Sequence, residues 1–329
     1  MSGDFVAVIG GGAWGTAFAV HLARAGTRVR LWAREPEVVA QIKNSRRNET
    51  FLPGVEIPEN IIPTNDLNET TDAAVIFWVV PTQFLRSVAE RFPRREGAIH
   101  IAMSKGIERK RWRFPYQILG EYFGEENVVV LSGPSFAEEV ARGLPTVMVA
   151  AAKNIDLARQ IQEFVSDQRI RVYRNPDPVG VSLGGAYKNV IAVATGISDG
   201  LGFGHNTRAA LITRGLSELV RLGEHFGAQK ETLFGIAGLG DMVLTCTSAK
   251  SRNYSFGLRL GQGKTTEQIL AESRHIAEGI YTTFGALYYA EKFGIELPIA
   301  DSVHRIVWKN SPPQEEVVRL MKRPLKQEW

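Results

Sequence analysis

Lys188 is the only charged residue in the segment SLGGAYKNVIAVATGI, residues 182–197. If this segment is helical, the side chains three, four and seven positions from Lys188 are uncharged, so the helix itself offers the lysine no partner. Burial of an unpaired ammonium is costly. The lysine must therefore reach water, meet a carboxylate from another segment, or have a lowered pKa. A lysine with a pKa near about 7–8 can act as a general acid or base.

A second segment contains groups that suit such a lysine. In GIAGLGDMVLTCTSAKSRNYSFG, residues 235–257, Asp241 and Thr245 are four positions apart and share one face if the segment is helical. Asp241 is the type of carboxylate that can orient a lysine. Farther along, three adjacent side chains form a compact donor cluster suited to a phosphate, Ser251, Arg252 and Asn253.

Two segments of the first half follow runs that are typical of buried strands. MSKGIE, residues 103–108, places Lys105 after one strand, and LSGPSFAEE, residues 131–139, places Gly133 and Ser135 after the next. Doubly wound folds bind their ligands at the carboxyl ends of the strands, so we expect these residues on the ligand-binding rim. Each of them also has an ordinary structural explanation as a cap, a turn or a solvated charge.

The stretch VIGGGAWGTAFA contains Gly10, Gly12 and Gly15 in the spacing G-x-G-x-x-G. In a dinucleotide-binding fold the first glycine permits a tight turn, the second lets the backbone approach a pyrophosphate, and the third allows close helix–strand packing. The motif here follows the first predicted strand and opens a helix, which is the context that such a motif requires. The sequence therefore predicts a dinucleotide site.

The end of the second predicted strand usually distinguishes NAD from NADP. An acidic residue there binds the ribose hydroxyls, whereas an arginine accommodates the 2′-phosphate. This chain has Arg34 followed by Glu35. Arg34 favours NADP(H) as the preferred cofactor, and Glu35 leaves NAD(H) as an alternative. The other interpretation of Arg34 is a surface arginine at a strand end.

The elements that position these residues change in type along the chain. Continuous apolar runs, typical of strands covered on both faces, recur in the first half at residues 5–10, 29–33, 73–81, 98–103, 127–134, 146–152 and 169–175. Strand and helix alternate there, which predicts a doubly wound, largely parallel α/β sheet. The proline-rich residues 51–66 are expected to form a loop or a short irregular excursion. Helical periodicity then dominates, as in residues 207–227, 266–272 and 285–294. We place a domain boundary near 178, between a dinucleotide-binding domain (1–178) and an all-helical domain (179–329).

Composition narrows the class of protein. The chain has 329 residues, 44% of them hydrophobic and 22% charged, which is ordinary for a globular protein of one large domain or two. The net charge of +4 is spread along the chain, which favours small phosphorylated ligands over nucleic acid. The single cysteine, Cys246, suits a reducing cytoplasm. We expect no secretory leader, no membrane insertion and no metal site.

Six motifs follow one another in order and at sensible spacing, GGGAWGTA, SKGIE, LSGPSFAEEV, GAYKNVIAVATGISDGLGFGHNTRAALITRGL, GLGDMVLTCTSAKSRN and AEGIYT. Together they resemble the bacterial NAD(P)-dependent glycerol-3-phosphate dehydrogenases over essentially the whole chain. The resemblance implies a Rossmann domain and an all-helical C-terminal domain. It also implies the reversible reduction of dihydroxyacetone phosphate to sn-glycerol 3-phosphate, which supplies the phospholipid backbone.

Carried over position by position, the resemblance implies that Lys188 donates and accepts the proton, that Lys105 assists, and that Asp241 lies beside the substrate. It implies substrate contacts at Lys105, Gly133, Ser135, Asn189, Asp241, Thr245, Ser251, Arg252 and Asn253. It implies cofactor contacts at Gly10, Gly12, Ala13, Trp14, Gly15, Arg34, Lys105, Ala137, Arg252 and Glu278. Arg34 lies where the family varies, so cofactor preference is less fixed than the reaction.

Other functions stay open from the sequence. A related two-domain dehydrogenase of a hydroxy acid or sugar acid would share this plan, although the cluster at residues 251–253 favours a phosphate. A nucleotide-sugar dehydrogenase would use Cys246 as a nucleophile, whereas we interpret this cysteine as a small core residue. A non-catalytic NADP-binding protein would not need Lys188, Lys105 and Asp241 together. Helical second halves of this kind often pair, so we expect a homodimer.

Overall fold

A computed structural model describes residues 5–272, 277–325 and 327–328. The described chain divides into two compact units. The first unit contains the residues up to Lys105 together with Arg113–Ser182, and the second contains Gly106–Trp112 and the residues from Leu183 on. The segment Gly106–Trp112 therefore leaves the first unit directly after Lys105.

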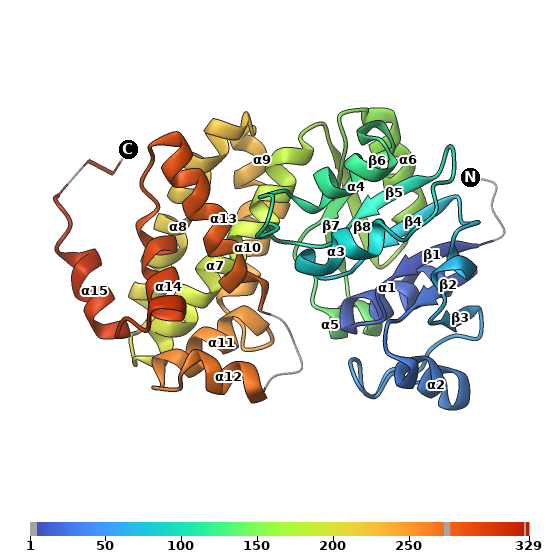
Figure 1. Ribbon diagram of the computed structural model, residues 1–329, viewed down its shortest axis with the longest axis horizontal. Coiled ribbons are helices and arrows are strands. Elements are labelled where there is room, and N and C mark those ends of the chain that lie inside the picture. The colour runs from blue at the N-terminus through green and yellow to red at the C-terminus, as the bar shows by residue number, and fades with distance from the viewer. Residues whose placement is uncertain (1–4, 273–276, 326, 329) are drawn as a thin grey trace. The chain divides into compact units, whose positions relative to one another are not determined.

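The first unit is built on an eight-stranded sheet with the order β3-β2-β1-β4-β5-β6-β7-β8 (Figure 1). Its strands are β1 Val6–Ile9, β2 Val29–Trp32, β3 Ile61–Thr64, β4 Val75–Trp78, β5 Ile99–Ala102, β6 Val128–Ser132, β7 Thr146–Ala151 and β8 Ile170–Asn175. Neighbouring strands are parallel except β6 and β7, which are antiparallel. The order reverses between β1 and β4, which is the switch point where such sheets bind ligands. The predicted doubly wound, largely parallel sheet is confirmed.

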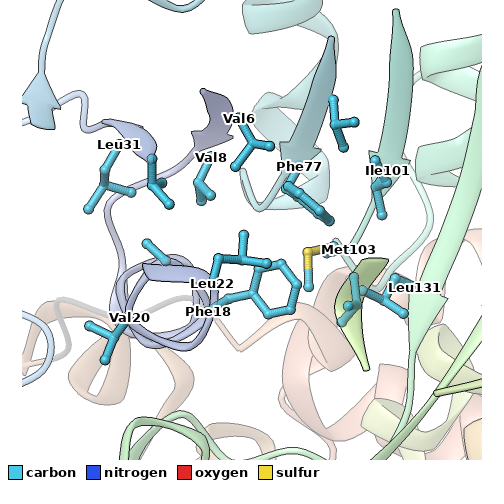
Figure 2. Packing of buried hydrophobic residues seen from close by; sticks show 14 of the residues in the cluster. Val6, Val8, Phe18, Val20, Leu22, Leu31, Phe77, Ile101, Met103 and Leu131 are labelled. Carbon is cyan, nitrogen blue, oxygen red and sulfur yellow. The ribbon is translucent and has the colours of Figure 1, made fainter. Parts of the chain in front are cut away.

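Helices cover the sheet because the strands are apolar on both faces. They are α1 Ala13–Arg24, α2 Pro36–Ser45, α3 Thr82–Ala89, α4 Pro115–Phe123, α5 Ala137–Arg142 and α6 Ile155–Val165. Figure 2 shows how α1 packs: Phe18 and Leu22, one helical turn apart, lie beneath the strands, beside Phe77 and Met103. The rings of Phe18 and Phe77 meet edge to face with centroids 4.9 Å apart. Each such buried side chain contributes roughly 1.5–3 kcal/mol, which fixes α1 against the sheet.

One prediction for this unit was wrong. Residues 51–66 were expected to form a loop or a short irregular excursion, but Ile61–Thr64 form β3, which pairs with β2 at the edge of the sheet. Pro63 lies within this strand. Proline lacks an N–H donor, so it is tolerated in an edge strand and not in a central one. Pro63 is therefore compatible with a strand here, because only one side of β3 is paired.

The described part of the second unit contains helices and no strands, as predicted (Figure 1, yellow to red). The long helix α7 Pro178–Gly200 enters it, and α8 His205–Phe226, α9 Lys230–Phe234, a π-helical turn Ile236–Gly240, α10 Asp241–Cys246, α11 Arg252–Gly261, α12 Thr266–Glu272, α13 Glu278–Phe293, α14 Pro298–Lys309 and α15 Pro313–Met321 follow. Among the described residues of both units, no helix is long and apolar enough to span a bilayer.

Candidate active site

The glycine motif forms a tight turn between β1 and α1. Gly10 has a φ of +128°, and a Cβ there would lie 2.9 Å from the backbone carbonyl carbon of Val79, just after β4. A Cβ on Gly15 would overlap the carbonyl oxygen of Gly10. Gly12 is different, because a Cβ there would meet nothing within 4 Å. The protein's own packing thus requires the first and third glycines, whereas the second faces open space at the switch point.

The N-terminus of α1 follows this turn and offers a site for an anion. Gly12 is the N-cap residue, and no acidic residue lies in the first turn of the helix. The N–H groups and the positive end of the helix dipole are therefore available to a phosphate. Ala13 and Trp14 lie in this first turn and are partly exposed. These features fit the pyrophosphate of a dinucleotide.

Arg34 lies two residues beyond Trp32, the last residue of β2, beside the same edge of the sheet. Its side chain is 70% exposed. The guanidinium Nε and Nη2 both donate to one Glu35 oxygen, Oε1, at 2.9 and 2.6 Å. The two residues that bear on cofactor choice are therefore paired with each other after β2, in an exposed ion pair that is weak enough for a 2′-phosphate to compete for the guanidinium.

Lys105, Gly133 and Ser135 meet at the carboxyl ends of the parallel neighbours β5 and β6. Both the Lys105 ammonium and the Ser135 hydroxyl donate to the carbonyl oxygen of Gly133, each at 3.0 Å. Ala137 begins α5 two residues farther on. The structure thus brings these predicted residues together on the rim of the first unit.

Lys188, in the second unit, meets a carboxylate from another helix. Its side chain is 8% exposed, and its ammonium donates to Asp241 Oδ1 at 2.5 Å and to Thr245 Oγ1 at 2.7 Å. The hydroxyl of Thr245 donates in turn to the Asp241 carbonyl oxygen at 2.6 Å. Asp241 and Thr245 are one turn apart on α10, so both side chains project from the same face. Of the three alternatives for this lysine, the structure shows the paired one.

Glycine allows the approach that forms this ion pair. A Cβ on Gly184, one turn before Lys188, would lie 2.8 Å from the carbonyl oxygen of Ala237. Ala237 belongs to the π-helical turn that leads into α10. The missing side chain therefore lets that backbone pack against α7, and this packing brings Asp241 to the lysine.

Asn189 and Asn253 connect three helices through their amide side chains. The Asn253 amide donates to Asn189 Oδ1 at 2.9 Å, and its own oxygen accepts from the N–H of Gly279 at 2.9 Å. Ser251 is the N-cap residue of α11, where its hydroxyl oxygen accepts from the N–H of Tyr254 at 3.2 Å. Ser251 and Asn253 are therefore buried and fixed in position at the start of α11.

Arg252 and Glu278 lie at two helix N-termini of the same unit. Arg252 is the first residue of α11 and is exposed, and Glu278 is the first residue of α13. The two charges interact electrostatically. Arg252 thus places a guanidinium at the N-terminus of α11, where the Glu278 carboxylate at the start of α13 interacts with it.

Sequence reasoning missed the crossing that positions α11. A Cβ on Gly196 of α7 would overlap a carbonyl oxygen of α11, and a Cβ on Gly257 of α11 would overlap one of α7. The two backbones are thus in direct contact, which sets the distance from Lys188 to the start of α11. The signal was present in the sequence as the spacing G-x-x-x-G, at Gly196 and Gly200 and again at Gly257 and Gly261.

Cys246 does not have the properties of a nucleophile. It is completely buried at the end of α10, and burial raises the pKa of its thiol to about 12. The thiol is therefore protonated at neutral pH, which removes the support for a cysteine-dependent mechanism. In the described ranges, no group of histidine, cysteine and acidic side chains could hold a metal ion.

A second buried carboxyl group, that of Glu218, bonds to Tyr187, the residue before Lys188. Glu218, 3% exposed on α8, accepts from the Tyr187 hydroxyl at 2.5 Å and from the N–H groups of Ile299 and Ala300 at 2.6 and 3.3 Å. It thereby caps α14. Burial raises the pKa of Glu218 from 4.5 to about 7, because it outweighs the hydrogen bonds that favour the charged form.

This raised pKa predicts a stability that falls with rising pH. The stabilisation is complete below pH 4.5, the ordinary pKa, and is lost as pH rises through about 7. The difference corresponds to about 3 kcal/mol in the free energy of unfolding. Urea unfolding at pH 5 and pH 8 measures it, and Glu218→Gln is expected to reduce the difference. An unchanged difference in the variant would assign it to other groups.

Comparison with known proteins agrees with this geometry. The family model for the N-terminus of NAD-dependent glycerol-3-phosphate dehydrogenase matches residues 5–158, and the model for the C-terminus matches residues 177–318. A glycerol-3-phosphate dehydrogenase (NAD(P)+) of Geobacter sp. strain M21 is 48% identical, with 98% of each chain covered. One from Thioalkalivibrio sulfidiphilus is 44% identical over the full length of both chains.

A solved structure has the same fold throughout. The glycerol-3-phosphate dehydrogenase of Coxiella burnetii superposes with a TM-score of 0.92 at 40% identity, covering 98% of this chain and 99% of that one. Both halves of this chain thus match in sequence and in structure. The chain belongs to the NAD-dependent glycerol-3-phosphate dehydrogenase family.

Proposed function

We propose that this protein catalyses the reversible reduction of dihydroxyacetone phosphate to sn-glycerol 3-phosphate with NADPH or NADH. The observation that carries the proposal is the buried cluster of Lys188, Asp241 and Thr245 in a chain of this family. A buried ammonium with an acceptor on each side is held in one position, as a proton donor must be. The names of the relatives support the same reaction and both forms of the cofactor.

Lys188 supplies the proton of the reaction. The bound nicotinamide provides the hydride that reduces the carbonyl carbon C2. Lys188 donates a proton from Nζ to the C2 oxygen, so that a hydroxyl group forms instead of a free alkoxide. Asp241 stabilises the ammonium before the transfer, and the Thr245 hydroxyl restricts the direction of Nζ. In the reverse reaction the neutral amine accepts the proton of the C2 hydroxyl.

The substrate phosphate is assigned to the start of α11. Helix N–H groups and the helix dipole favour an anion there, and the exposed Arg252 adds a formal positive charge. Ser251 and Asn253 are fixed at the same helix end. Lys105, Gly133 and Ser135 are assigned as further substrate contacts. Holding the carbonyl in one orientation supplies much of the rate gain in such reactions.

A substrate comparison tests the function. Purified protein is assayed with NADPH and dihydroxyacetone phosphate, dihydroxyacetone, or a 2-oxo acid. We expect kcat/KM for dihydroxyacetone phosphate to exceed that for dihydroxyacetone by at least roughly 10²-fold, because the charge-assisted hydrogen bonds to phosphate are lost. Preferential reduction of the 2-oxo acid would instead support the hydroxy-acid dehydrogenase alternative.

The exposed Arg34 predicts a preference for NADPH. In Arg34→Gln we expect the ratio of kcat/KM for NADPH to that for NADH to fall at least roughly tenfold, because a charge-assisted contact with the 2′-phosphate is removed. Arg159, an exposed arginine paired with Asp156 on α6, provides the matched control Arg159→Gln. An unchanged ratio in Arg34→Gln would mean that Arg34 is only a surface residue.

The remaining proposals concern the roles of the two domains, the oligomeric state, the location and the use of the product. We assign cofactor binding to residues 1–178 and the substrate chemistry to 179–329. We also propose that the enzyme is a cytoplasmic homodimer whose product feeds phospholipid synthesis. Light scattering tests the dimer, because a mass near twice 36.4 kDa supports it and a mass of 36.4 kDa contradicts it.

A further inference from the structure

Asn48 is a fully buried amide that belongs to none of the predicted site residues. Its side chain is 0% exposed. The Nδ2 group donates to the carbonyl oxygen of Gly11 at 2.9 Å and to Thr16 Oγ1 at 2.8 Å. The Thr16 hydroxyl donates to the same Gly11 oxygen at 3.2 Å. Asn48 therefore reaches from 37 residues away in the sequence into the glycine turn before α1.

The segment that carries Asn48 is held in place at several points. Asn48 Oδ1 accepts from the N–H of Phe51 at 3.1 Å, which closes a turn. Leu52 is buried against Ala17 of α1 and Ala141 of α5, with Trp14 packed on the same cluster. The amide is therefore presented from a packed segment, and its direction is set by the surrounding structure.

These hydrogen bonds set the orientation of one peptide group. The carbonyl of Gly11 and the N–H of Gly12 belong to the same peptide, and no peptide in the described chain is cis. In a trans peptide the two groups point in opposite directions. Because Asn48 and Thr16 hold the carbonyl inward, the N–H of Gly12 points away from them. That N–H lies on the exposed residue whose Cβ position is open space.

We propose that Asn48 is a positioning residue for the dinucleotide, since it aims the Gly12 N–H at the cofactor pyrophosphate. The inference deepens the proposed function and rests on it for the identity of the cofactor. Asn48 acts through the backbone of the glycine turn and does not touch the cofactor itself. Its loss leaves the Gly11 carbonyl less restrained, so the peptide rotates and the donor is misdirected.

The chain contains a matched control for this proposal. Asn60 lies in the same connection between α2 and β3, and its Nδ2 group also donates twice, to the carbonyl oxygens of Ala23 and Thr27 at 2.8 Å. These acceptors lie at the other end of α1. Asn48→Ala and Asn60→Ala therefore remove the same chemical group, and each removes two donated hydrogen bonds near one end of α1. Asn48→Ala also removes the acceptor of the Phe51 N–H.

The test is a fluorescence titration of each variant with NADPH, combined with kinetics and thermal unfolding. We expect the NADPH Kd of Asn48→Ala to rise roughly tenfold or more, the range for a lost buried hydrogen bond. The kcat at saturating NADPH and the KM for dihydroxyacetone phosphate should stay close to wild type. Asn60→Ala should lower Tm and leave the NADPH Kd unchanged. Equal changes in Kd for both variants, or no change for Asn48→Ala, would overturn the proposal.

Thr16→Val keeps the inference testable if Asn48→Ala does not fold. The isosteric variant removes one acceptor for Asn48 and one donor to Gly11, so a several-fold rise in NADPH Kd is expected. A normal Kd in folded Thr16→Val would count against the mechanism. The titration also separates this proposal from the proposed function, because wild-type protein that binds NADPH without reducing dihydroxyacetone phosphate would contradict only the function.

Discussion

Lys188→Ala is expected to lower kcat by at least ~10²-fold and to leave the Kd for NADPH nearly unchanged. The ammonium is the proposed proton donor, whereas the glycine turn that receives the dinucleotide belongs to the other unit of the chain. Steady-state kinetics and a fluorescence titration measure the two quantities. Lys292→Ala, which removes an exposed lysine of α13, is the control and should keep wild-type kcat. Wild-type kcat in Lys188→Ala would exclude the lysine as the proton donor.

In Lys188→Ala, the loss of the proton donor must be distinguished from a loss of folding stability. Removing Lys188 leaves Asp241, 1% exposed, as a buried charge without its cation, and breaking such a pair costs about 3–5 kcal/mol. The double variant Lys188→Met with Asp241→Asn removes both charges together. We expect it to unfold closer to the wild-type Tm and to be as inactive as Lys188→Ala. Recovery of activity along with stability would show that the lysine serves the fold alone.

Alanine at Gly15 and alanine at Gly12 are both expected to weaken NADPH binding, but only alanine at Gly15 is expected to destabilise the fold. A Cβ at position 15 overlaps the Gly10 carbonyl oxygen, so Gly15→Ala must push α1 away from the turn. We expect a loss of roughly 1–3 kcal/mol or more in the free energy of unfolding, together with loss of NADPH binding. A Cβ at position 12 meets nothing within 4 Å, and its φ of −70° suits any residue. Gly12→Ala should therefore cost at most about 1 kcal/mol, as a poorer N-cap residue.

The two variants are distinguished when NADPH binding and thermal stability are measured together. In Gly12→Ala the new methyl group occupies the space assigned to the pyrophosphate, so the NADPH Kd should rise at least roughly tenfold with little change in Tm. Calorimetry and fluorescence titration on the same samples measure both. A wild-type Kd in Gly12→Ala would mean that the dinucleotide does not approach the turn at this residue.

Periodicity and spacing were sufficient for much of the fold. Apolar runs separated by helices predicted the parallel sheet because strands buried on both faces have no polar side. The four-residue interval between Asp241 and Thr245 predicted their shared face, since the helical repeat sets which side chains align. The absence of charge around Lys188 predicted that any partner had to come from elsewhere. These inferences succeeded because each depends on a local pattern of residue type and spacing.

The features of the fold and the site that the sequence pattern did not predict depend on contacts between distant segments. Pro63 favoured a loop over a strand in the sequence, and it is compatible with β3 because this strand lies at the edge of the sheet. Asn48 was not predicted as a site residue, because its hydrogen bonds to Gly11 and Thr16 form only after the connection folds back onto α1. The sequence predicted Asp241 as a carboxylate that could orient Lys188, but the contact between them forms only when α10 packs against α7. Local pattern does not encode these pairings, since each is set by the tertiary arrangement.

A single-turnover experiment tests the proposed reduction of dihydroxyacetone phosphate most directly. Enzyme premixed with a substoichiometric amount of NADPH is mixed rapidly with dihydroxyacetone phosphate while absorbance at 340 nm is followed. We expect the bound NADPH to be consumed, with one sn-glycerol 3-phosphate formed for each NADPH. Demonstrated NADPH binding with unchanged absorbance would contradict the proposed reduction, because the cofactor site would then serve a substrate other than dihydroxyacetone phosphate.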